Sequence, residues 1–230
     1  MVINITYMKM KKLIYTLSLF LMLYSCSIDN YDAPNAVLSG KVIDNVTNEP
    51  VENGGVNGGT VIHVLEGNSK QPIICNSFPD GRFVNAAFFS GDYKIVALGA
   101  FKMVSDTIHV SVLNNAEVEI KVLPNVRLNT SIVSRDASTI TVKVEYEKVH
   151  ESQVLNELCV IWSTYPNPNM FTFSGGGQKI EKVDSQNLSS GEKIFVISGL
   201  NNGLNYYIRA AARTNAAGSY YNYSKPIQTQ

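Results

Sequence analysis

The stretch Ile140-Thr-Val-Lys-Val-Glu-Tyr-Glu147 alternates apolar and polar side chains at every step. Successive side chains of a strand point to opposite faces, so this period of two predicts a strand with one buried and one wetted face. Beyond the first 26 residues, no window of 11 residues keeps a helical period with capping residues. The chain is therefore expected to be all-β.

The same pattern recurs on both sides of this stretch, in short runs separated by turn signals such as Pro79-Asp80-Gly81 and Gly91-Asp92. Short strands at regular spacing indicate β-sandwiches. The step Pro124-Asn125 predicts a boundary, and hence two tandem sandwiches at 36–124 and 125–230, each large enough to bury its own core. The other strand-like runs lie at 38–43, 61–65, 82–84, 93–97, 108–112, 118–122, 158–163, 194–197 and 206–211.

The first 26 residues have the order of an export signal. A basic cluster at 9–12 precedes an apolar run at 13–23, and Ser25 is followed by Cys26. Eleven helical residues rise only about 16 Å, roughly half of a bilayer core, so the run is too short to span it. We expect a lipoprotein signal peptide at 1–25, a lipid on Cys26 and a tether at 26–35. An ordinary signal peptide with an incidental cysteine is the alternative.

Charge and cysteine content exclude several classes of function. The chain has 19 basic and 19 acidic residues, and removal of the signal leaves 16 basic and 19 acidic residues. This charge lacks the clustered Lys and Arg residues of a nucleic-acid-binding surface, so nucleic acid is excluded as a partner. Cys75 and Cys159 are expected to be buried free side chains, with a single disulfide as the alternative. No cysteine or histidine spacing suggests a metal, and no motif suggests a cofactor.

Motifs that mark common catalytic sites are absent. The sequence lacks G-x-S-x-G, H-E-x-x-H and G-x-G-x-x-G, and its histidines are His63, His109 and His150. Two small sandwiches offer no evident cleft for a pair of catalytic carboxylates. The glycine-rich segment 53–59 precedes no helix, so it predicts a flexible loop or a bulged edge rather than a phosphate cradle. We therefore expect no enzyme, although a Ser/His/Asp group assembled from distant positions stays open.

Both predicted domains resemble known modules. The second resembles a fibronectin type III module, which implies that Tyr206 forms a tyrosine corner. The residues that carry this likeness are 159–168, 198–210, 215–218 and Tyr221. The first resembles a transthyretin-like, carboxypeptidase-regulatory sandwich, on residues 38–44, 79–83 and 90–95.

The mature chain is also similar to a family of Bacteroidetes surface lipoproteins of unknown function, on residues 29–34, 80–85 and 89–93. Members of that family are usually encoded beside starch-utilisation-type uptake pairs. The resemblance therefore implies an outer-membrane transporter and its glycan-binding lipoprotein as partners. It also implies a lipid-anchored protein of the outer membrane that faces the cell exterior. Because only Asp29 and Asp32 follow the lipid site as an export signal, the periplasmic face stays open.

Two functions are compatible with these features. The first is a glycan-binding or accessory component of a polysaccharide uptake system, and the alternative is a structural or adhesive spacer that presents or docks a protein partner. Sugars stack on flat aromatic faces, so aromatic residues of the second domain are the candidate ligand-binding residues. Trp162 shares parity with Leu158 and Val160, which favours the core, and the two later tyrosines could instead pair across strands. The candidates are Tyr165, Phe171, Phe173, Trp162, Tyr221 and Tyr223.

Overall fold

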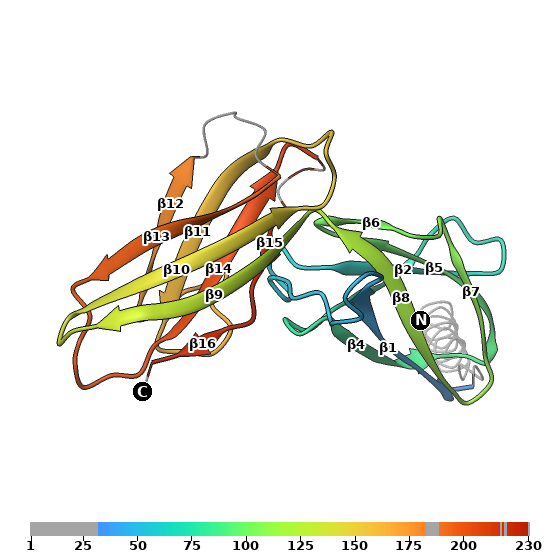
Figure 1. Cartoon of the computed structure of the whole chain (residues 1–230). Coiled ribbons are helices and arrows are strands. Elements are labelled where there is room, and N and C mark those ends of the chain that lie inside the picture. Colours follow the sequence, from blue (N-terminus) through green and yellow to red (C-terminus); the bar gives the residue numbers. More distant parts are fainter. Residues whose placement is uncertain (1–31, 183–188, 217, 219, 230) are drawn as a thin grey trace, which may run out of the picture. The chain divides into compact units, whose positions relative to one another are not determined.

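The computed structural model describes residues 32–182, 189–216, 218 and 220–229, and this part of the chain consists of strands, turns and irregular segments without a helix (Figure 1). The predicted all-β class is confirmed. Among the described residues there is accordingly no helical segment able to cross a membrane. The predicted signal peptide and Cys26 lie outside the described residues. Residues Pro34–Gln230 form one compact unit.

Eight strands build the first sandwich from two four-stranded sheets. One sheet has the order β4(Arg82–Phe88), β1(Ala36–Asp44), β8(Asn115–Pro124), β6(Phe101–Met103). The other has the order β3(Ile73–Asn76), β2(Val61–Glu66), β5(Gly91–Leu98), β7(Ile108–Val112). Strands β1 and β8 pair in parallel, from Val37 opposite Asn115 to Asp44 opposite Val122, and the remaining pairs are antiparallel.

The core of the first sandwich lies between the inward faces of these sheets. Its members are the apolar residues that alternate along the strands, such as Leu38 and Val42 of β1 and Ile95 of β5, which are fully buried. Phe88 and Tyr93 meet edge to face with ring centroids 5.2 Å apart, a favourable aromatic geometry. Each buried side chain of this size contributes about 1.5–3 kcal/mol, so the alternation seen in the sequence is the main stabilising feature.

The second sandwich contains the remaining strands. A three-stranded sheet has the order β13(Ser190–Ser198), β10(Thr139–Lys148), β9(Val126–Arg135). The facing sheet has the order β12(Gly177–Lys182), β11(Leu155–Ser163), β14(Tyr207–Thr214), β15(Asn222–Tyr223), with β16(Ile227–Gln228) also paired to β14. Residues 140–147, whose alternation predicts a strand, lie in β10, and Ile140, Val142, Val144 and Tyr146 are its buried apolar residues.

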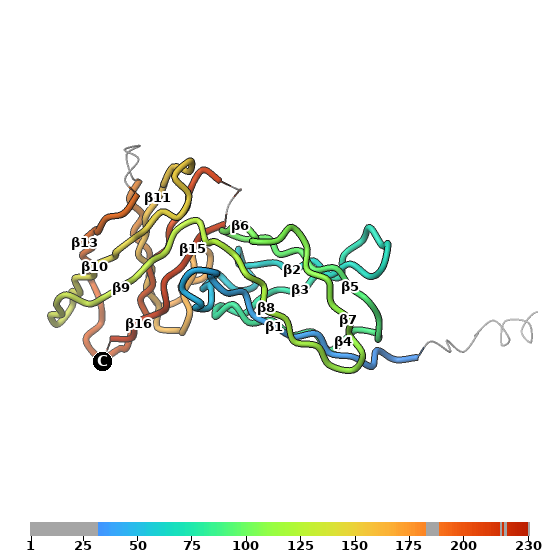
Figure 2. The backbone as a smooth tube through the Cα atoms, turned by 45° about the vertical axis from the view of Figure 1, so that its right-hand side comes forward, coloured from blue at the N-terminus to red at the C-terminus, as the bar shows by residue number. Residues whose placement is uncertain are grey.

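The chain passes directly from the first sandwich into the second. Only Asn125 separates the end of β8 from the start of β9. Figure 2 shows the tube running on from β8 into β9. The side chain of Asn125 is 5 % exposed and accepts a hydrogen bond from Gln153, and its backbone N–H donates to the carbonyl of Ala100. The step between the sandwiches is therefore a buried, hydrogen-bonded residue.

Strands β11 and β14 are buried on both faces. One face packs into the core of the second sandwich, and the other belongs to a smaller cluster with Cys159, Ile161 and Ala211. A wetted face for β14, expected from its alternation, is wrong: Arg209 and Ala211 are fully buried. The reason is that residues 169–173, strand β15 and a loop of the first sandwich cover this face.

Candidate functional site

Two of the candidate aromatic residues expose their rings. Tyr165 is 65 % exposed and Phe171 is 56 % exposed, and both lie in the loop 164–176 between β11 and β12. Phe173 is partly buried against the smaller cluster. Trp162 is partly buried against the core, on the face that its parity indicates. Tyr165 and Phe171 are therefore the exposed residues among the candidate aromatic residues of this loop.

Hydrogen bonds within the loop define its course. The Asn169 Oδ1 atom accepts the backbone N–H groups of Phe171 and Thr172, both at 2.8 Å. The backbone N–H of Tyr165 donates to Ser163 Oγ at 3.0 Å, and that of Met170 donates to Tyr223 Oη at 3.2 Å. A loop whose backbone is bonded at several points loses less entropy when a ligand binds to the side chains that it carries.

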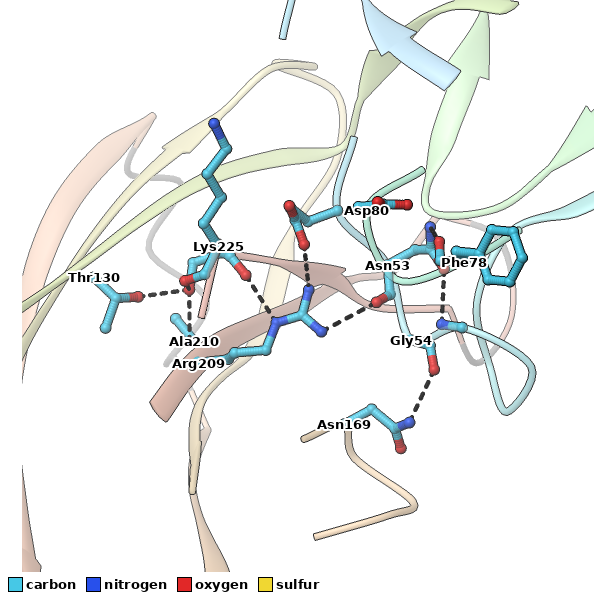
Figure 3. Close-up of polar contacts among 12 residues, drawn as sticks. Asn53, Gly54, Phe78, Asp80, Thr130, Asn169, Arg209, Ala210 and Lys225 are labelled. Atoms are coloured by element: carbon cyan, nitrogen blue, oxygen red, sulfur yellow. Dashed lines mark hydrogen bonds and ion pairs between the residues drawn. The ribbon is translucent and has the colours of Figure 1, made fainter. Parts of the chain in front are cut away.

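The same loop contacts the glycine-rich segment of the first sandwich. Asn169 Nδ2 donates to the carbonyl of Gly54 at 2.8 Å (Figure 3). Gly58 has a φ of 73°, and a Cβ on it would lie 2.3 Å from Cε2 of Phe171, so the ring rests on the backbone there. The segment 53–59 is a loop, as one alternative of the prediction had it, but Asn53, Gly54 and Gly55 within it are buried.

Arg209 connects the two sandwiches from the interior. Its side chain is fully buried, and its three nitrogens donate to the Ser224 carbonyl at 2.9 Å, the Asn53 carbonyl at 3.2 Å and Glu52 Oε2 at 2.9 Å (Figure 3). The guanidinium carbon also lies 4.8 Å from the ring centroid of Tyr223. Every nitrogen of this buried cation therefore has an acceptor.

Burial changes the ionisation of both members of this pair. It lowers the pKa of Arg209 to about 10, although the Glu52 carboxylate raises it. Burial also raises the pKa of Glu52, and the opposing effect of Arg209 is smaller. Arg209 remains charged at neutral pH, and the Glu52 carboxylate supplies its buried counter-charge.

Two further ion pairs join the sandwiches. Arg127 Nε lies 2.5 Å from Asp44 Oδ2, and both side chains are largely buried. Lys225 Nζ lies 3.0 Å from Glu49 Oε2, with both side chains mostly exposed. Burial alone would raise the pKa of Asp44. The hydrogen bonds from Arg127 and from a backbone N–H together have a larger effect, and the net pKa of this carboxyl is lowered.

A groove of about 300 Å³ lies beside these contacts, between the segment 44–52 of the first sandwich and β9 with residues 222–227 of the second. The sequence indicated no cleft for a pair of catalytic carboxylates, and it could not indicate this groove, because each wall belongs to a different domain. The carboxylates in it, Asp44, Glu49 and Glu52, are each paired with a cation. Within the described residues, no three metal-ligating side chains come together.

The remaining candidate tyrosines are interior residues. Tyr221 is 8 % exposed and donates to Glu157 Oε2 at 2.6 Å, and Tyr223 is 5 % exposed. Burial raises the pKa of Tyr223 to about 12. Their predicted role in ligand stacking is wrong, because their faces are occupied by the arginines Arg209 and Arg213 and by the surrounding cluster.

Other predicted residues occupy structural positions. Tyr206 Oη accepts the backbone N–H of Asn201 at 3.1 Å, which is the contact that a tyrosine corner makes. Cys75 and Cys159 are free and buried, as predicted. Burial raises the pKa of the Cys159 thiol to about 12.

The junction residues Glu52, Asn53, Asn169 and Arg209 were not anticipated from the sequence. Two signals could have indicated them. Arg209 stands in a strand whose neighbours Ala210, Ala211 and Ala212 are apolar on both faces, which is unusual for a strand with a wetted side. The clustered glycines mark a backbone that another segment approaches closely.

Comparison with known proteins agrees with this architecture. Residues 36–123 match the family model described as "Protein of unknown function (DUF3823) N-terminal domain". The curated proteins offer no match to the chain.

Three similar crystal structures span both sandwiches. A DUF3823 family protein from Bacteroides ovatus is 23 % identical, with a TM-score of 0.68 over 85 % of this chain and 98 % of that one. A DUF3823 family protein from Parabacteroides merdae is 16 % identical, with a TM-score of 0.71 over 86 % of this chain and 100 % of that one. A Bacteroides uniformis protein described as a "putative carbohydrate binding protein" is 18 % identical, with a TM-score of 0.68 over 86 % and 99 %. The sequence of the first sandwich therefore matches the N-terminal domain of DUF3823 proteins, and the chain as a whole shares the fold of these three structures.

Proposed function

We propose that this chain is a non-enzymatic DUF3823 protein that binds glycans through Tyr165 and Phe171. The observation that carries the proposal is the exposure of two aromatic rings on a loop that is hydrogen-bonded within itself and to the other sandwich. Sugar rings present C–H groups that stack on such faces. Exposed apolar surface that is gathered in one place marks an interaction site, and both rings belong to the same loop.

In this proposal, the chain has an accessory role in polysaccharide uptake. A lipid on Cys26 would anchor the chain in the outer membrane, facing outward, where its partners would be a transporter and its glycan-binding lipoprotein. More than one acyl chain gives stable attachment, since each buried methylene contributes about 0.8 kcal/mol. Metabolic labelling with a palmitate analogue tests this part, because Cys26→Ser is expected to remove the label and to release the protein from the membrane fraction.

A glycan array with the purified full chain tests binding. Tyr165→Ala and Phe171→Ala are each expected to weaken binding of a captured glycan by at least about tenfold, the loss typical of a truncated interface anchor. Phe89→Ala is the matched control, since Phe89 is also exposed, at 45 %. It follows Phe88, the residue of β4 that pairs with Ala36 at the start of β1, whereas the glycine-rich segment lies near the other end of β1. Equal binding by all three variants would refute the aromatic site.

The alternative function, a structural spacer, is favoured by one observation. Three ion pairs and several hydrogen bonds join the sandwiches, so they cannot swing freely about the single connecting residue. A rigid pair of sandwiches suits a protein that holds a partner at a set distance from a surface. Failure of the wild-type chain to capture any glycan would favour this function.

A further inference from the structure

The groove between the sandwiches has the size of a small-ligand site. Its volume of about 300 Å³ stands at the lower end of the range of about 300–1,000 Å³ that small-molecule pockets occupy. Glu49 and Glu52 line it from the first sandwich, and Asn129, Lys225 and Ile227 line it from the second. A ligand in the groove would therefore contact both sandwiches at once.

Charge pairing decides which class of ligand fits. The groove holds carboxylates and cations in matched pairs, namely Asp44 with Arg127 and Glu49 with Lys225. Glu52 is neutralised from behind by Arg209. An anionic ligand would meet the carboxylates, a cationic ligand would meet the bases, and either would have to displace an existing pair. A neutral ligand meets neither obstacle.

Hydrogen-bonding capacity remains after these pairs are formed. Glu52 uses Oε2 for Arg209, while Oε1 makes no hydrogen bond to the described residues and is not an enclosed atom, so it can accept from the groove. Lys225 uses one ammonium proton for Glu49 and keeps two donors. Asn129 donates its Nδ2 to Glu145, which leaves its carbonyl oxygen as an acceptor. These acceptors and donors belong to residues that line the same groove, as does the apolar side chain of Ile227.

We propose that this groove binds one unit of a neutral sugar, whose adjacent hydroxyl groups donate to Glu52 Oε1 and accept from Lys225 Nζ. The inference rests on the proposed glycan binding and adds to it a second contact, separate from the loop of Tyr165 and Phe171. Hydroxyl groups both donate and accept hydrogen bonds, so a neutral pyranose can bond to the donors and to the acceptors of the groove without breaking an ion pair. The ring's apolar face would lie toward Ile227.

Ligand-observed saturation-transfer NMR with the full chain tests the proposal. The probes are the methyl glycosides of glucose, galactose, mannose and xylose, each to about 50 mM, with glucuronate and glucosamine as the anionic and cationic comparisons. At least one neutral glycoside is expected to bind saturably and more tightly than both charged sugars. Asn129→Trp, which fills the groove from an exposed position, is expected to weaken that binding by at least tenfold, on the order of 1.4 kcal/mol.

A second variant keeps the test independent of any effect of tryptophan on folding. Lys225→Met removes a donor at the rim and is expected to weaken binding about threefold to tenfold, the loss of one hydrogen bond. Lys41→Met is the matched control, because Lys41 forms a similar exposed pair with Glu119 away from the groove.

The outcomes separate this inference from the proposed function. Binding of a neutral glycoside that survives Tyr165→Ala but is lost in Asn129→Trp supports the groove, whatever the array shows. Absence of saturable binding by all four neutral glycosides overturns it, as does binding that Asn129→Trp and Lys225→Met leave unchanged. Glycan capture on the array that depends on Tyr165 alone would then leave the aromatic site standing without the groove.

Discussion

Removal of the Glu52 carboxylate is expected to destabilise the protein far more than removal of the neighbouring Glu49 carboxylate. Both residues form an ion pair across the junction, at 2.9 Å with Arg209 and at 3.0 Å with Lys225. The pairs differ in burial, because the side chains of Arg209 and Glu52 are 0 % and 12 % exposed, whereas those of Lys225 and Glu49 are 65 % and 61 % exposed.

The magnitudes follow from this difference. Glu52→Ala leaves a buried guanidinium without its counter-charge, a change that costs about 3–5 kcal/mol. Glu49→Ala removes an exposed pair, which contributes about 0–1 kcal/mol. A whole domain is stable by only about 5–15 kcal/mol, so the first loss is a large fraction of the total and the second is small. The double variant Glu52→Ala/Arg209→Met is expected to be more stable than Glu52→Ala alone, because no unpaired charge remains in the junction.

Urea denaturation provides the measurement. Trp162, which packs against the core of the second sandwich, reports unfolding by its fluorescence, and calorimetry reports the whole chain. The free energy of unfolding of each variant is compared with that of the wild type at pH 7. Equal losses for Glu52→Ala and Glu49→Ala, or a double variant weaker than Glu52→Ala, would refute the view that the buried charge governs the junction.

Three further predictions concern single residues. The lowered pKa of Asp44 means that its pair with Arg127 stabilises the fold fully above pH 3.8, and that this stabilisation is lost as the pH falls through the lower folded value. Acid titration of Asp44→Asn should therefore show a smaller loss of stability below pH 3.8 than the wild type shows. Gly58→Ala meets an aromatic ring at 2.3 Å, whereas Gly67→Ala, also at positive φ, meets open space; the melting temperature should fall further for the first, and an equal fall would contradict the contact. Tyr206→Phe deletes the hydroxyl that accepts a backbone N–H and should cost about 1 kcal/mol in urea denaturation; an unchanged midpoint would show that the corner is not stabilising.

The parts of the fold that the sequence predicts are those with a local cause. Strands such as β10 and β1 follow from a period of two, because alternation along a few residues is sufficient to assign two faces. Short strands cannot be predicted from such alternation. Strands β6 and β15 have three and two residues, which is too few to show a period, and β9 has an irregular burial pattern that alternates over only part of its length.

The junction could not be predicted, because its contacts join residues far apart in the chain. Arg209 meets Glu52 and Asn53 across 157 and 156 positions, and Asn169 meets Gly54 across 115. Nothing in the local pattern distinguishes an arginine that faces water from one that faces another domain. The exposure of Tyr165 and Phe171 was predictable for a local reason, since prolines and glycines surround them and exclude regular strand pairing.

The parallel pairing of β1 with β8 has a consequence for the order in which the molecule folds. Partner residues such as Val37 and Asn115 lie 78 positions apart in the chain. Closing that loop costs on the order of 4 kcal/mol in chain entropy before the hydrogen bonds and contacts between the two strands can form. Strand β1 therefore cannot complete this pairing until β8, the last strand of the same sandwich, is present, and separations of this length slow folding. In a chain that crosses a membrane from its amino end, the first sandwich would stay incomplete until β8 had crossed, and β9, the first strand of the second sandwich, would follow one residue later.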